Sequence, residues 1–346
     1  MKTSKFITRR SFIEKATVTA GLATIGTGNV FGETSGFSKA QVNLPREVWI
    51  ATVSQHGMNM DTPEAMVQSI FGIIKKSLVQ SPDIICLPEV FMTFTIRGKI
   101  SRQEEMDRSE KLLKDFMIFA RTNNCYVVCP IYTTENGKIY NSAVLIDRQG
   151  NRIGEYRKMH LTEGEIAGGL TPGPLQQPVF KTDFGVIGFQ ICFDIEWDDG
   201  WKSLRKQGAE IVFWPSAFAG GQAVNAKAWQ NKYVVVSSTR KDTTKICDIT
   251  GETVAQTGSF ERNLIVAPVN LEKEFLHTWP FIRHFDDIRA KYGRKIRITT
   301  FFEEEWSIIE SLSPDVKVKD ILTEFKIQTY EEMIQAAEIA QIKARG

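Results

Sequence analysis

The sequence predicts an α/β protein whose sheet is parallel or mixed. Strand-like and helix-like stretches alternate from residue 46 onward, as is typical of α/β folds. The chain has 346 residues, of which 42% are hydrophobic and 24% charged, so it can bury a substantial core as one large domain or two ordinary ones. The sequence contains no stretch of about eighteen uninterrupted apolar residues, so we expect no transmembrane helix.

The first elements follow one another from residue 46 to residue 158. We expect a helix over DTPEAMVQSIFGIIKKSLVQS, because Asp61 can cap its start, Glu64 follows three residues later and apolar residues share one face. A second amphipathic helix is expected over RQEEMDRSEKLLKDFMIFARTNN, and a hairpin that turns at Gln149-Gly150 over KIYNSAVLIDRQGNRIGEYRK. The expected strands of this part are EVWIATVSQH, DIICLPEVF and CYVVCPIYT.

The later elements continue the same alternation. Helices are expected over 198–207 and 222–232. The terminal segment TYEEMIQAAEIAQIKARG is an expected helix in which Thr329 and Glu332 form a capping box and Gly346 lies beyond the end. The expected strands are GVIGFQICF, AEIVFWPS, KYVVVSSTR and RNLIVAPVNL.

The N-terminal segment has the features of an export signal. Arg9 and Arg10 stand before Ser11 and Phe12, and a mildly apolar stretch rich in Thr, Gly and Ala follows. This pattern resembles a twin-arginine signal, and the alternative is a disordered basic tail. We therefore expect residues 1–40 to be a signal peptide and linker, and the protein to be periplasmic or extracellular.

Charge and cysteine usage exclude several classes of protein. The formal net charge of +2 gives no argument for a nucleic-acid partner, which would need a strongly basic face. The five cysteines are an odd number, and Cys125 and Cys129 would lie about 13 Å apart on one strand, too far for a disulfide. Because C-x3-C lacks a second pair and the four histidines are scattered, we expect no metal site.

Three ionisable residues stand where expected strands end. Cys192 follows GFQI, Glu89 follows DIICLP, and Lys158 follows the hairpin, with Glu163 and Glu165 close behind. Reactive groups collect at the carboxyl ends of strands in α/β sheets. A nucleophilic thiol such as Cys192 needs a base to remove its proton. Burial would raise the pKa of Glu89 and suit it to proton transfer. The ammonium group of Lys158 could stabilise the negative charge on a carbonyl oxygen under attack.

Each of these residues taken singly also has a purely structural explanation. Buried cysteines are common, and charges at strand ends are usually solvated. A Cys-His pair is a further alternative, since His160 lies two residues beyond Lys158 and shares its face in an extended segment.

Three segments resemble the signature stretches of the nitrilase superfamily, the carbon-nitrogen hydrolases. They are LPEVF, YRKMHLTEGE and GFQICFDIEW, in the family's order and approximate spacing, and the likeness covers roughly residues 46–275. The resemblance implies a four-layer α-β-β-α sandwich that assembles into homodimers or larger homo-oligomers. It also implies that Glu89, Lys158 and Cys192 form a catalytic triad.

The roles of these residues follow from the resemblance. Glu89 is expected to accept the thiol proton, and Cys192 to attack the substrate carbon and form a thioester. Lys158 and the backbone N–H of Phe193 are expected to hold the oxyanion. The family's second glutamate maps to Glu165, with Glu163 as the alternative, and His160 then becomes a structural hydrogen-bonding residue. The resemblance also implies that the reaction needs no metal and no organic cofactor.

The chain departs from the family pattern near the expected pocket. Gln230-Asn231 replaces a common Glu-Asn pair, and Thr239-Arg240 stands where an Asn often follows the strand. Phe193-Asp194 resembles the amidase and carbamoylase branches, whereas nitrilases commonly carry Trp-Glu there. The candidate residues for an apolar substrate pocket are Phe94, Trp214, Ala217 and Phe218.

The predicted function is thiol-dependent hydrolysis of a small amide or N-carbamoyl compound. The alternatives are N-acyl transfer or nitrile hydrolysis by the same triad, and a non-catalytic binding or assembly protein with the same fold. We expect the hydrolase domain at residues 41–276 and a C-terminal extension at 277–346 that packs on the core or on a partner subunit.

Overall fold

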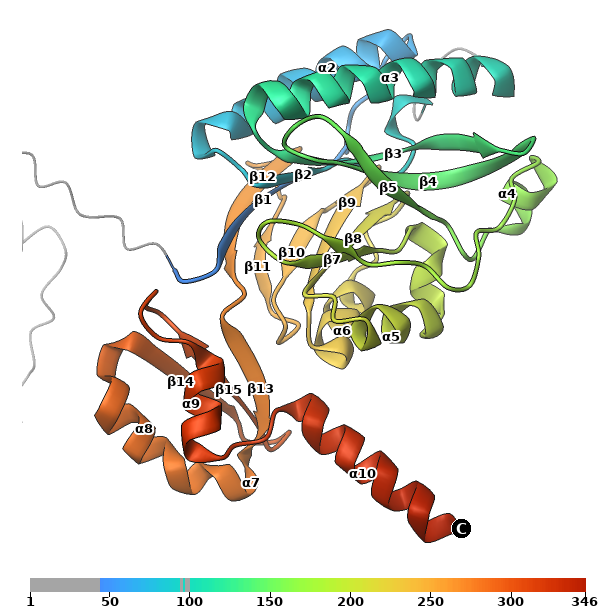
Figure 1. Cartoon of the computed structure of the whole chain (residues 1–346). Coiled ribbons are helices and arrows are strands. Elements are labelled where there is room, and N and C mark those ends of the chain that lie inside the picture. The colour runs from blue at the N-terminus through green and yellow to red at the C-terminus, as the bar shows by residue number, and fades with distance from the viewer. Residues whose placement is uncertain (1–43, 94–95, 97–99) are drawn as a thin grey trace, which may run out of the picture. The chain divides into compact units, whose positions relative to one another are not determined.

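Two six-stranded mixed sheets form the centre of the computed structural model (Figure 1). The structure describes residues 44–93, 96 and 100–346, so the predicted signal at residues 1–40 and the candidate pocket residue Phe94 lie outside the described residues. The first sheet has the order β12-β1-β2-β3-β4-β5, with strands Leu264–Asn270, Glu47–Val53, Ile84–Cys86, Tyr126–Glu135, Lys138–Ile146 and Arg152–Arg157. The second sheet has the order β11-β10-β9-β8-β7-β6, with strands Thr253–Gln256, Lys245–Cys247, Val234–Thr239, Ile211–Ser216, Val186–Phe189 and Phe180–Lys181.

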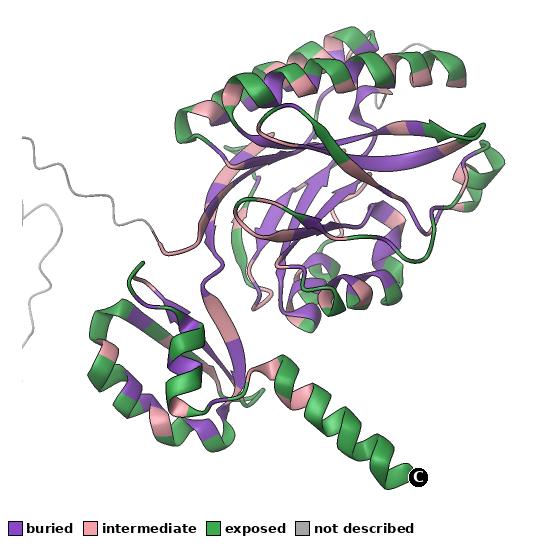
Figure 2. Cartoon of the chain, viewed as in Figure 1, coloured by how far each residue is buried: buried purple, intermediate pink, exposed green. Residues whose placement is uncertain are grey.

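Helices cover the outer face of each sheet and complete the predicted four-layer sandwich. The helices α2 (Pro63–Lys75) and α3 (Arg102–Asn123) cover the first sheet, and α5 (Asp199–Lys206) and α6 (Gln222–Asn231) cover the second (Figure 1). Separate apolar clusters fill the space between the sheets and the space beneath each helical layer. The inner strands of both sheets are therefore buried along most of their length, while the edge strands β5 and β11 and the outer faces of the helices are more exposed (Figure 2).

The α2 helix begins one residue later than the sequence indicates. The prediction that Asp61 caps this helix is wrong, because the Thr62 hydroxyl accepts the hydrogen bond from the Ala65 N–H at 3.2 Å. Pro63 then occupies the first helical position, where its missing N–H has no intrahelical partner to lose. A 3₁₀ turn, η1 (Lys76–Gln80), continues the chain beyond the helix.

Small polar side chains join the two sheets at their centre. Thr52 Oγ1 donates to the Ser237 carbonyl at 2.6 Å, and Ser238 Oγ donates to the Val53 carbonyl at 2.9 Å. Ser238 also lies 3.1 Å from the Cys86 carbonyl oxygen. These contacts hold the carboxyl ends of β1, β2 and β9 next to one another, and Glu89 follows β2 at this place.

A three-stranded antiparallel sheet follows the sandwich. Its order is β13-β15-β14, and its strands are Lys273–His277, Trp306–Ser311 and Ile296–Phe301. Alternate residues of β13 face two apolar clusters, because Phe275 packs into the cluster between the main sheets and Leu276 into a cluster with α8 (Phe285–Tyr292) and α9 (Val318–Phe325). The C-terminal sheet is thus continuous with the main core on one face and has its own core on the other.

The last helix, α10 (Tyr330–Arg345), begins as the sequence predicts. Thr329 and Glu332 form the expected capping box, with N–H···O distances of 2.9 and 3.1 Å. The remaining short elements are η2 (Phe91–Thr93), α4 (Glu163–Ala167), η3 (Cys192–Glu196), α7 (Thr278–Phe281), η4 (Ile282–His284) and η5 (Gly293–Lys295).

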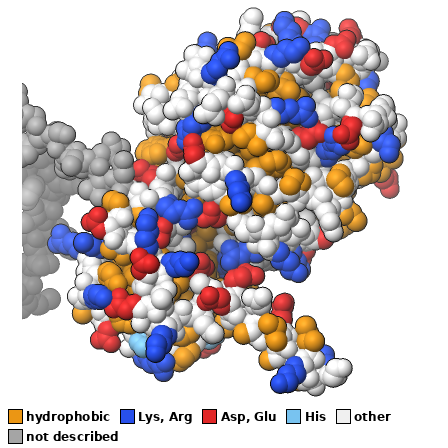
Figure 3. All heavy atoms as spheres, in the orientation of Figure 1, with side chains coloured by type: hydrophobic (Ala, Val, Ile, Leu, Met, Phe, Trp, Pro, Cys, Tyr) orange, Lys and Arg blue, Asp and Glu red, His pale blue; other side chains and the backbone are white. Residues whose placement is uncertain are grey.

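Surface charges of both signs are mixed on the face that Figure 3 shows. This agrees with the near balance of 43 Lys and Arg against 41 Asp and Glu in the sequence. Among the residues that the structure describes, no helix has both the length and the apolar composition that a membrane span requires.

Candidate active site

Three strand ends carry the predicted catalytic side chains into the interior. Glu89 lies three residues beyond β2, Lys158 directly follows β5, and Cys192 lies three residues beyond β7. Their exposed fractions are 1%, 2% and 7%, so all three are shielded from bulk water. Buried charges in proteins need partners of opposite charge, and the surroundings of these residues supply them.

Lys158 lies between two carboxylates. Its Nζ is 3.0 Å from Glu89 Oε1, and 2.8 and 2.9 Å from the two carboxylate oxygens of Glu165. These are charge-assisted hydrogen bonds in a dry environment, where they are stronger than in water. The structure therefore brings together Glu89, Lys158 and Glu165.

Glu165 is fixed in place by the start of α4. Thr162 caps this helix: its N–H donates to Glu165 Oε2 at 2.8 Å, and its hydroxyl accepts from the Glu165 N–H at 3.2 Å. Glu163, the alternative second glutamate, is exposed in the first turn of the same helix. The geometry thus favours Glu165 as the glutamate that holds Lys158.

Asn141 of β4 joins both carboxylates and was missed by the sequence reasoning. Its Nδ2 donates to Glu89 Oε1 at 2.8 Å and lies 3.1 Å from Glu165 Oε1. The Lys158 N–H donates to the Asn141 carbonyl at 2.8 Å, so strand pairing places the two side chains beside each other. An amide within the otherwise apolar stretch NSAVLI was the available signal.

Arg240 is the second cation of the site. Its Nη2 donates to Glu89 Oε2 at 2.8 Å, and its backbone N–H donates to the Ser216 carbonyl at 2.9 Å. The sequence marks Arg240 only as part of a departure from the family pattern. The structure places it at the end of β9, on the opposite carboxylate oxygen of Glu89 from Lys158.

The charge state of Glu89 differs from the expectation. Burial alone would raise the pKa of Glu89, as predicted, but the positive charges of Lys158 and Arg240 and their hydrogen bonds outweigh burial and lower it to about 2. The same carboxylate raises the pKa of Lys158 against the opposing effect of burial. At neutral pH Glu89 is therefore a carboxylate and Lys158 an ammonium.

Cys192 occupies a strained turn between β7 and η3. Its φ is +47°, a region that side-chain-bearing residues rarely adopt, and Val90, next to Glu89, has a φ of +39°. Strain of this kind persists only where the surroundings impose it, and it is common at functional sites. Here the Trp214 indole N–H donates to the Cys192 carbonyl at 2.9 Å and helps to hold the turn.

The Cys192 thiol is neutral at rest. Burial and the nearby Glu89 carboxylate raise its pKa to about 12, although Lys158 and hydrogen bonds from Ala217 and Ser216 act in the opposite direction. A thiol in this state becomes a nucleophile only when a base removes its proton. Glu89 is close enough to influence the thiol electrostatically and is ionised, so it can serve as that base.

Asp194 ties the nucleophile turn to the strand that carries Lys158. Its carboxylate accepts hydrogen bonds from the Tyr156 hydroxyl at 2.7 Å, the His160 N–H at 2.8 Å and the Ile191 N–H at 2.8 Å. The His160 ring is 3.0 Å from Asp194 through Nδ1 and stacks on Trp197 with a centroid distance of 4.2 Å.

His160 is thus engaged by the support of the site. The hydrogen bond to Asp194 raises the pKa of His160 despite the opposing effect of partial burial. This geometry favours the interpretation of His160 as a hydrogen-bonding residue over the alternative of a Cys-His pair.

The predicted pocket residues have different surroundings. Trp214 is fully buried and supports the Cys192 backbone, so in this structure its ring does not form an exposed pocket wall. Ala217 and Phe218 are half-buried just beyond β8, and the Phe218 ring packs edge-on against Trp214. Phe193 lies in the first turn of η3, where helical N–H groups lack intrahelical acceptors, as its expected role requires.

The described part of the chain contains neither a disulfide nor a candidate metal-binding cluster. All five cysteines are free and buried. Within residues 44–93, 96 and 100–346, no group of three or more His, Cys, Asp or Glu side chains is placed to hold a metal ion.

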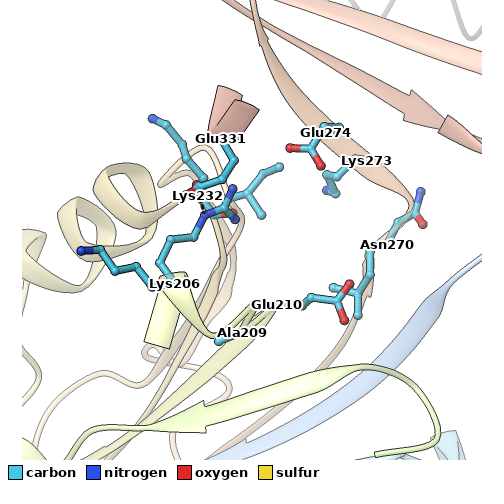
Figure 4. A pocket seen from close by; sticks show the side chains of 12 residues that line it. Lys206, Ala209, Glu210, Lys232, Asn270, Lys273, Glu274 and Glu331 are labelled. Carbon is cyan, nitrogen blue, oxygen red and sulfur yellow. Dashed lines mark hydrogen bonds and ion pairs between the residues drawn. The ribbon is translucent and has the colours of Figure 1, made fainter. Parts of the chain in front are cut away.

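A separate cavity of about 300 Å³ contains none of the predicted catalytic residues (Figure 4). Lys232 lines it, with Nζ 3.6 Å from the Trp229 ring centroid, 4.5 Å from Phe275 and 5.5 Å from Tyr330. Burial and Arg205 lower the pKa of Lys232 to about 8, whereas the ring faces favour its charged form. Lys232 therefore connects α6 to β13 and to the start of α10.

Comparison with known proteins identifies relatives named as an amidase and as a beta-ureidopropionase. Deaminated glutathione amidase of Dictyostelium discoideum is 27% identical over 222 residues, which are 57% of this chain and 72% of that protein. Beta-ureidopropionase of Arabidopsis thaliana is 31% identical over 201 residues, which are 53% of this chain and 48% of that protein.

Solved structures show the same fold at lower identity. An amidase from Nesterenkonia sp. superposes with a TM-score of 0.59 at 20% identity, covering 67% of this chain and 94% of that one. A carbon-nitrogen hydrolase from Helicobacter pylori G27 gives a TM-score of 0.59 at 18% identity, covering 72% and 99% of the two chains.

The sequence model of one family spans the sandwich. The model described as carbon-nitrogen hydrolase matches residues 50–274, from β1 to β13. This segment contains Glu89, Lys158, Glu165 and Cys192. The chain therefore belongs to the carbon-nitrogen hydrolase family of the nitrilase superfamily and is an enzyme of that family.

Proposed function

We propose that the enzyme hydrolyses a small amide or N-carbamoyl compound through a thioester on Cys192. The observation that carries this proposal is the buried cluster in which Lys158 contacts Glu89 at 3.0 Å and Glu165 at 2.8 Å, with the neutral Cys192 thiol within electrostatic reach. The cluster offers a base, a cation for the oxyanion and a nucleophile, which are the groups that acyl transfer to sulfur requires.

The first half of the proposed reaction forms the thioester. The Cys192 S–H bond breaks as its proton moves to Glu89, and the sulfur electron pair forms a bond to the substrate carbon. The carbonyl electrons move onto oxygen, where Lys158 and the Phe193 N–H stabilise the negative charge. Glu89 then gives the proton to the leaving nitrogen, and the C–N bond breaks.

The second half of the proposed reaction releases the acid. Glu89 takes a proton from water as the water oxygen attacks the thioester carbon, and the thiolate leaves and recovers its proton. Because Glu89 is a weak base and the thiol a weak acid in the resting site, proton transfer and attack on carbon have to occur together. The growing oxyanion beside Lys158 makes the combined step favourable.

The substrate class is supported by the residues after the nucleophile and by the names of relatives. Phe193-Asp194 resembles the amidase and carbamoylase branches, and relatives are named as an amidase and a beta-ureidopropionase. Another relative, from Pyrococcus abyssi, is named as a nitrilase, with 29% identity over 174 residues. Nitriles are therefore included among the test compounds.

A mass-spectrometric screen tests the proposal. Purified enzyme is incubated with amides, N-carbamoyl compounds and nitriles, and both ammonia release and the mass of the Cys192 peptide are followed. We expect turnover of an amide or carbamoyl compound that is lost in Cys192→Ala. A mixed amide formed in the presence of an added amine would indicate an acyltransferase, and the absence of both turnover and a Cys192 adduct with every class would contradict the proposed function.

Export and assembly also belong to the proposal. We propose that residues 1–40 direct export by the twin-arginine route, on the strength of Arg9-Arg10 followed by Ser11-Phe12. In a bacterial host, replacing both arginines by lysine should leave the enzyme in the cytoplasm, as fractionation would show. We further propose a homodimer or larger homo-oligomer, which sedimentation analysis of the full chain tests.

A further inference from the structure

The two carboxylate oxygens of Glu89 have different numbers of donors. Oε1 accepts from Asn141 Nδ2 at 2.8 Å and from Lys158 Nζ at 3.0 Å. Among the described residues, Oε2 accepts from Arg240 Nη2 at 2.8 Å. Since a carboxylate oxygen offers about two lone-pair sites, Oε1 is filled by its two donors and Oε2 keeps one site for a proton.

We propose that Arg240 is a positioning residue, which holds Glu89 as a carboxylate and leaves one lone pair of Oε2 to receive the Cys192 proton. This proposal rests on the proposed function, because it assigns the atom through which the proton of the thiol travels. Arg240 acts through Glu89 and has no bond-forming role of its own.

The backbone holds Arg240 in register with the nucleophile. The Arg240 N–H donates to the Ser216 carbonyl at 2.9 Å, so the end of β9 is fixed to the end of β8. The residues at that end of β8, Ser216 and Ala217, also lower the pKa of Cys192 through hydrogen bonds. The same strand end thus contacts both Arg240 and Cys192. Glu89 accepts a hydrogen bond from the Arg240 guanidinium and interacts electrostatically with the Cys192 thiol.

Charge balance explains why a second cation is needed. Glu89 and Glu165 carry two negative charges, and Lys158 contacts both of them. Without Arg240 this cluster would have a net charge of −1, which favours a proton on a carboxylate and would block Glu89 as a base. With Arg240 the four charges named here balance, and the two cations keep Glu89 ionised.

The other groups that face this pair keep their charge states. Cys192 is a neutral thiol, for the reasons given above. Tyr132 lies close enough to Arg240 to interact electrostatically, and burial raises the pKa of this phenol, so it is neutral as well. When the rate at which Cys192 reacts is measured against pH, the rate should fall on the acidic side as Glu89 becomes protonated. We call this part of the profile the acid limb, and we expect it to report on Glu89.

Arg240 also affects the second proton transfer. When Oε2 carries the proton taken from sulfur, the adjacent guanidinium makes that carboxylic acid a strong donor. The O–H bond then breaks as the N–H bond of the leaving group forms, and the carboxylate returns to its ion pair with Arg240. One cation thus favours the ionised base before attack and the departure of the proton after it.

The test measures how fast iodoacetamide alkylates Cys192 as a function of pH. Alkylation forms an S–C bond, expels iodide and requires loss of the thiol proton, but it does not require amide hydrolysis. The rate is read by mass spectrometry of the Cys192 peptide after a short pH jump. The compared proteins are wild type, Arg240→Gln, Arg240→Lys and the control Arg148→Gln, which breaks an ion pair with Asp83 and Asp183 outside the site.

We expect the acid limb to move upward in Arg240→Gln by about one to three pH units, because loss of a nearby positive charge raises a carboxyl pKa. Arg240→Lys should keep the limb near its wild-type position, with a lower rate, and Arg148→Gln should not move it. In a Glu89→Gln background, Arg240→Gln should have no further effect on the limb. A merely structural role would lower the rate without moving the limb, and this result would overturn the proposal.

Wild type alone provides a test if Arg240→Gln does not fold. The proposal requires a wild-type acid limb below the ordinary glutamate value of 4.5, and a limb at or above that value contradicts it. Failure of the proposed function would give a different result. The enzyme would then not hydrolyse amides, but Arg240→Gln would still move the acid limb of Cys192 alkylation upward. Turnover without any shift contradicts the role of Arg240 alone.

Discussion

Replacing Lys158 by methionine removes a buried ammonium from between two carboxylates. The side chains of Lys158 and Glu89 are each 1% exposed, and that of Glu165 is 19% exposed. Removing one partner of a buried ion pair leaves uncompensated charge and typically costs about 3–5 kcal/mol. We therefore expect Lys158→Met to lower the free energy of unfolding by about that amount at pH 7.

The loss of stability should depend on pH with a definite sign. In wild type the folded-state pKa of Glu89 lies below its unfolded value, so Glu89 contributes stability that is present above pH 4.5 and is lost as the pH falls toward 2. Without Lys158 the folded-state pKa of Glu89 rises and this contribution shrinks or disappears. The difference between wild type and variant should therefore be largest near pH 7 and smaller below pH 4.5.

Urea denaturation followed by tryptophan fluorescence at pH 4 and pH 7 measures this difference. The matched control is Lys114→Met, which breaks an exposed pair with Glu110 whose side chains are 69% and 73% exposed. Exposed pairs contribute about 0–1 kcal/mol, so the control should be nearly neutral at both pH values. A loss in Lys158→Met no larger than in the control, or one that is equal at pH 4 and pH 7, would refute this account of the charge cluster.

Two further substitutions and one titration of wild type provide additional tests. Trp214→Phe removes the 2.9 Å hydrogen bond to the Cys192 carbonyl, so we expect slower alkylation of Cys192 and a loss of about 0.5–1.5 kcal/mol in urea denaturation. Lys232→Met removes the cation that lies 3.6 Å from the Trp229 ring centroid. Amide hydrogen exchange should then become faster at the start of α10 near Tyr330, because the contact that joins α6 to α10 is lost. Unchanged exchange would contradict the role of Lys232 in joining these helices. Because burial and Glu89 raise the pKa of Cys192 to about 12, wild type should show no thiolate absorbance near pH 8, and a titration there would be inconsistent with the described site.

Local sequence patterns predicted the individual elements and the α/β class, whereas the four-layer sandwich was implied by the resemblance to the nitrilase superfamily. The alternation of elements predicted the mixed sheets, and Thr329 with Glu332 predicted the start of α10. These features depend on neighbours along the chain, such as the N-cap hydroxyl and the residue three positions later. The N-cap of α2 was placed at Asp61 instead of Thr62 because two adjacent residues had suitable side chains and only the backbone geometry distinguishes them.

Positions of the site residues were predictable, whereas their partners were not. The strand ends directed attention to these residues, since Glu89 and Cys192 each follow an apolar run and Lys158 follows the expected hairpin. Asn141 and Arg240 lie 52 and 151 residues from Glu89 and reach it only through the pairing of strands. The same long-range contacts reversed the predicted direction of the Glu89 pKa, because burial could be inferred from the sequence and the guanidinium could not.

Rapid-quench peptide mapping during turnover of a simple amide tests the central chemistry most directly. The enzyme is mixed with excess substrate, stopped in acid within milliseconds and digested, and each peptide is weighed. We predict an acyl group on the peptide that contains Cys192, formed before the acid is released and absent from Cys192→Ala, which should not turn over. Sustained hydrolysis by Cys192→Ala, or an acyl group carried by another residue, would contradict it.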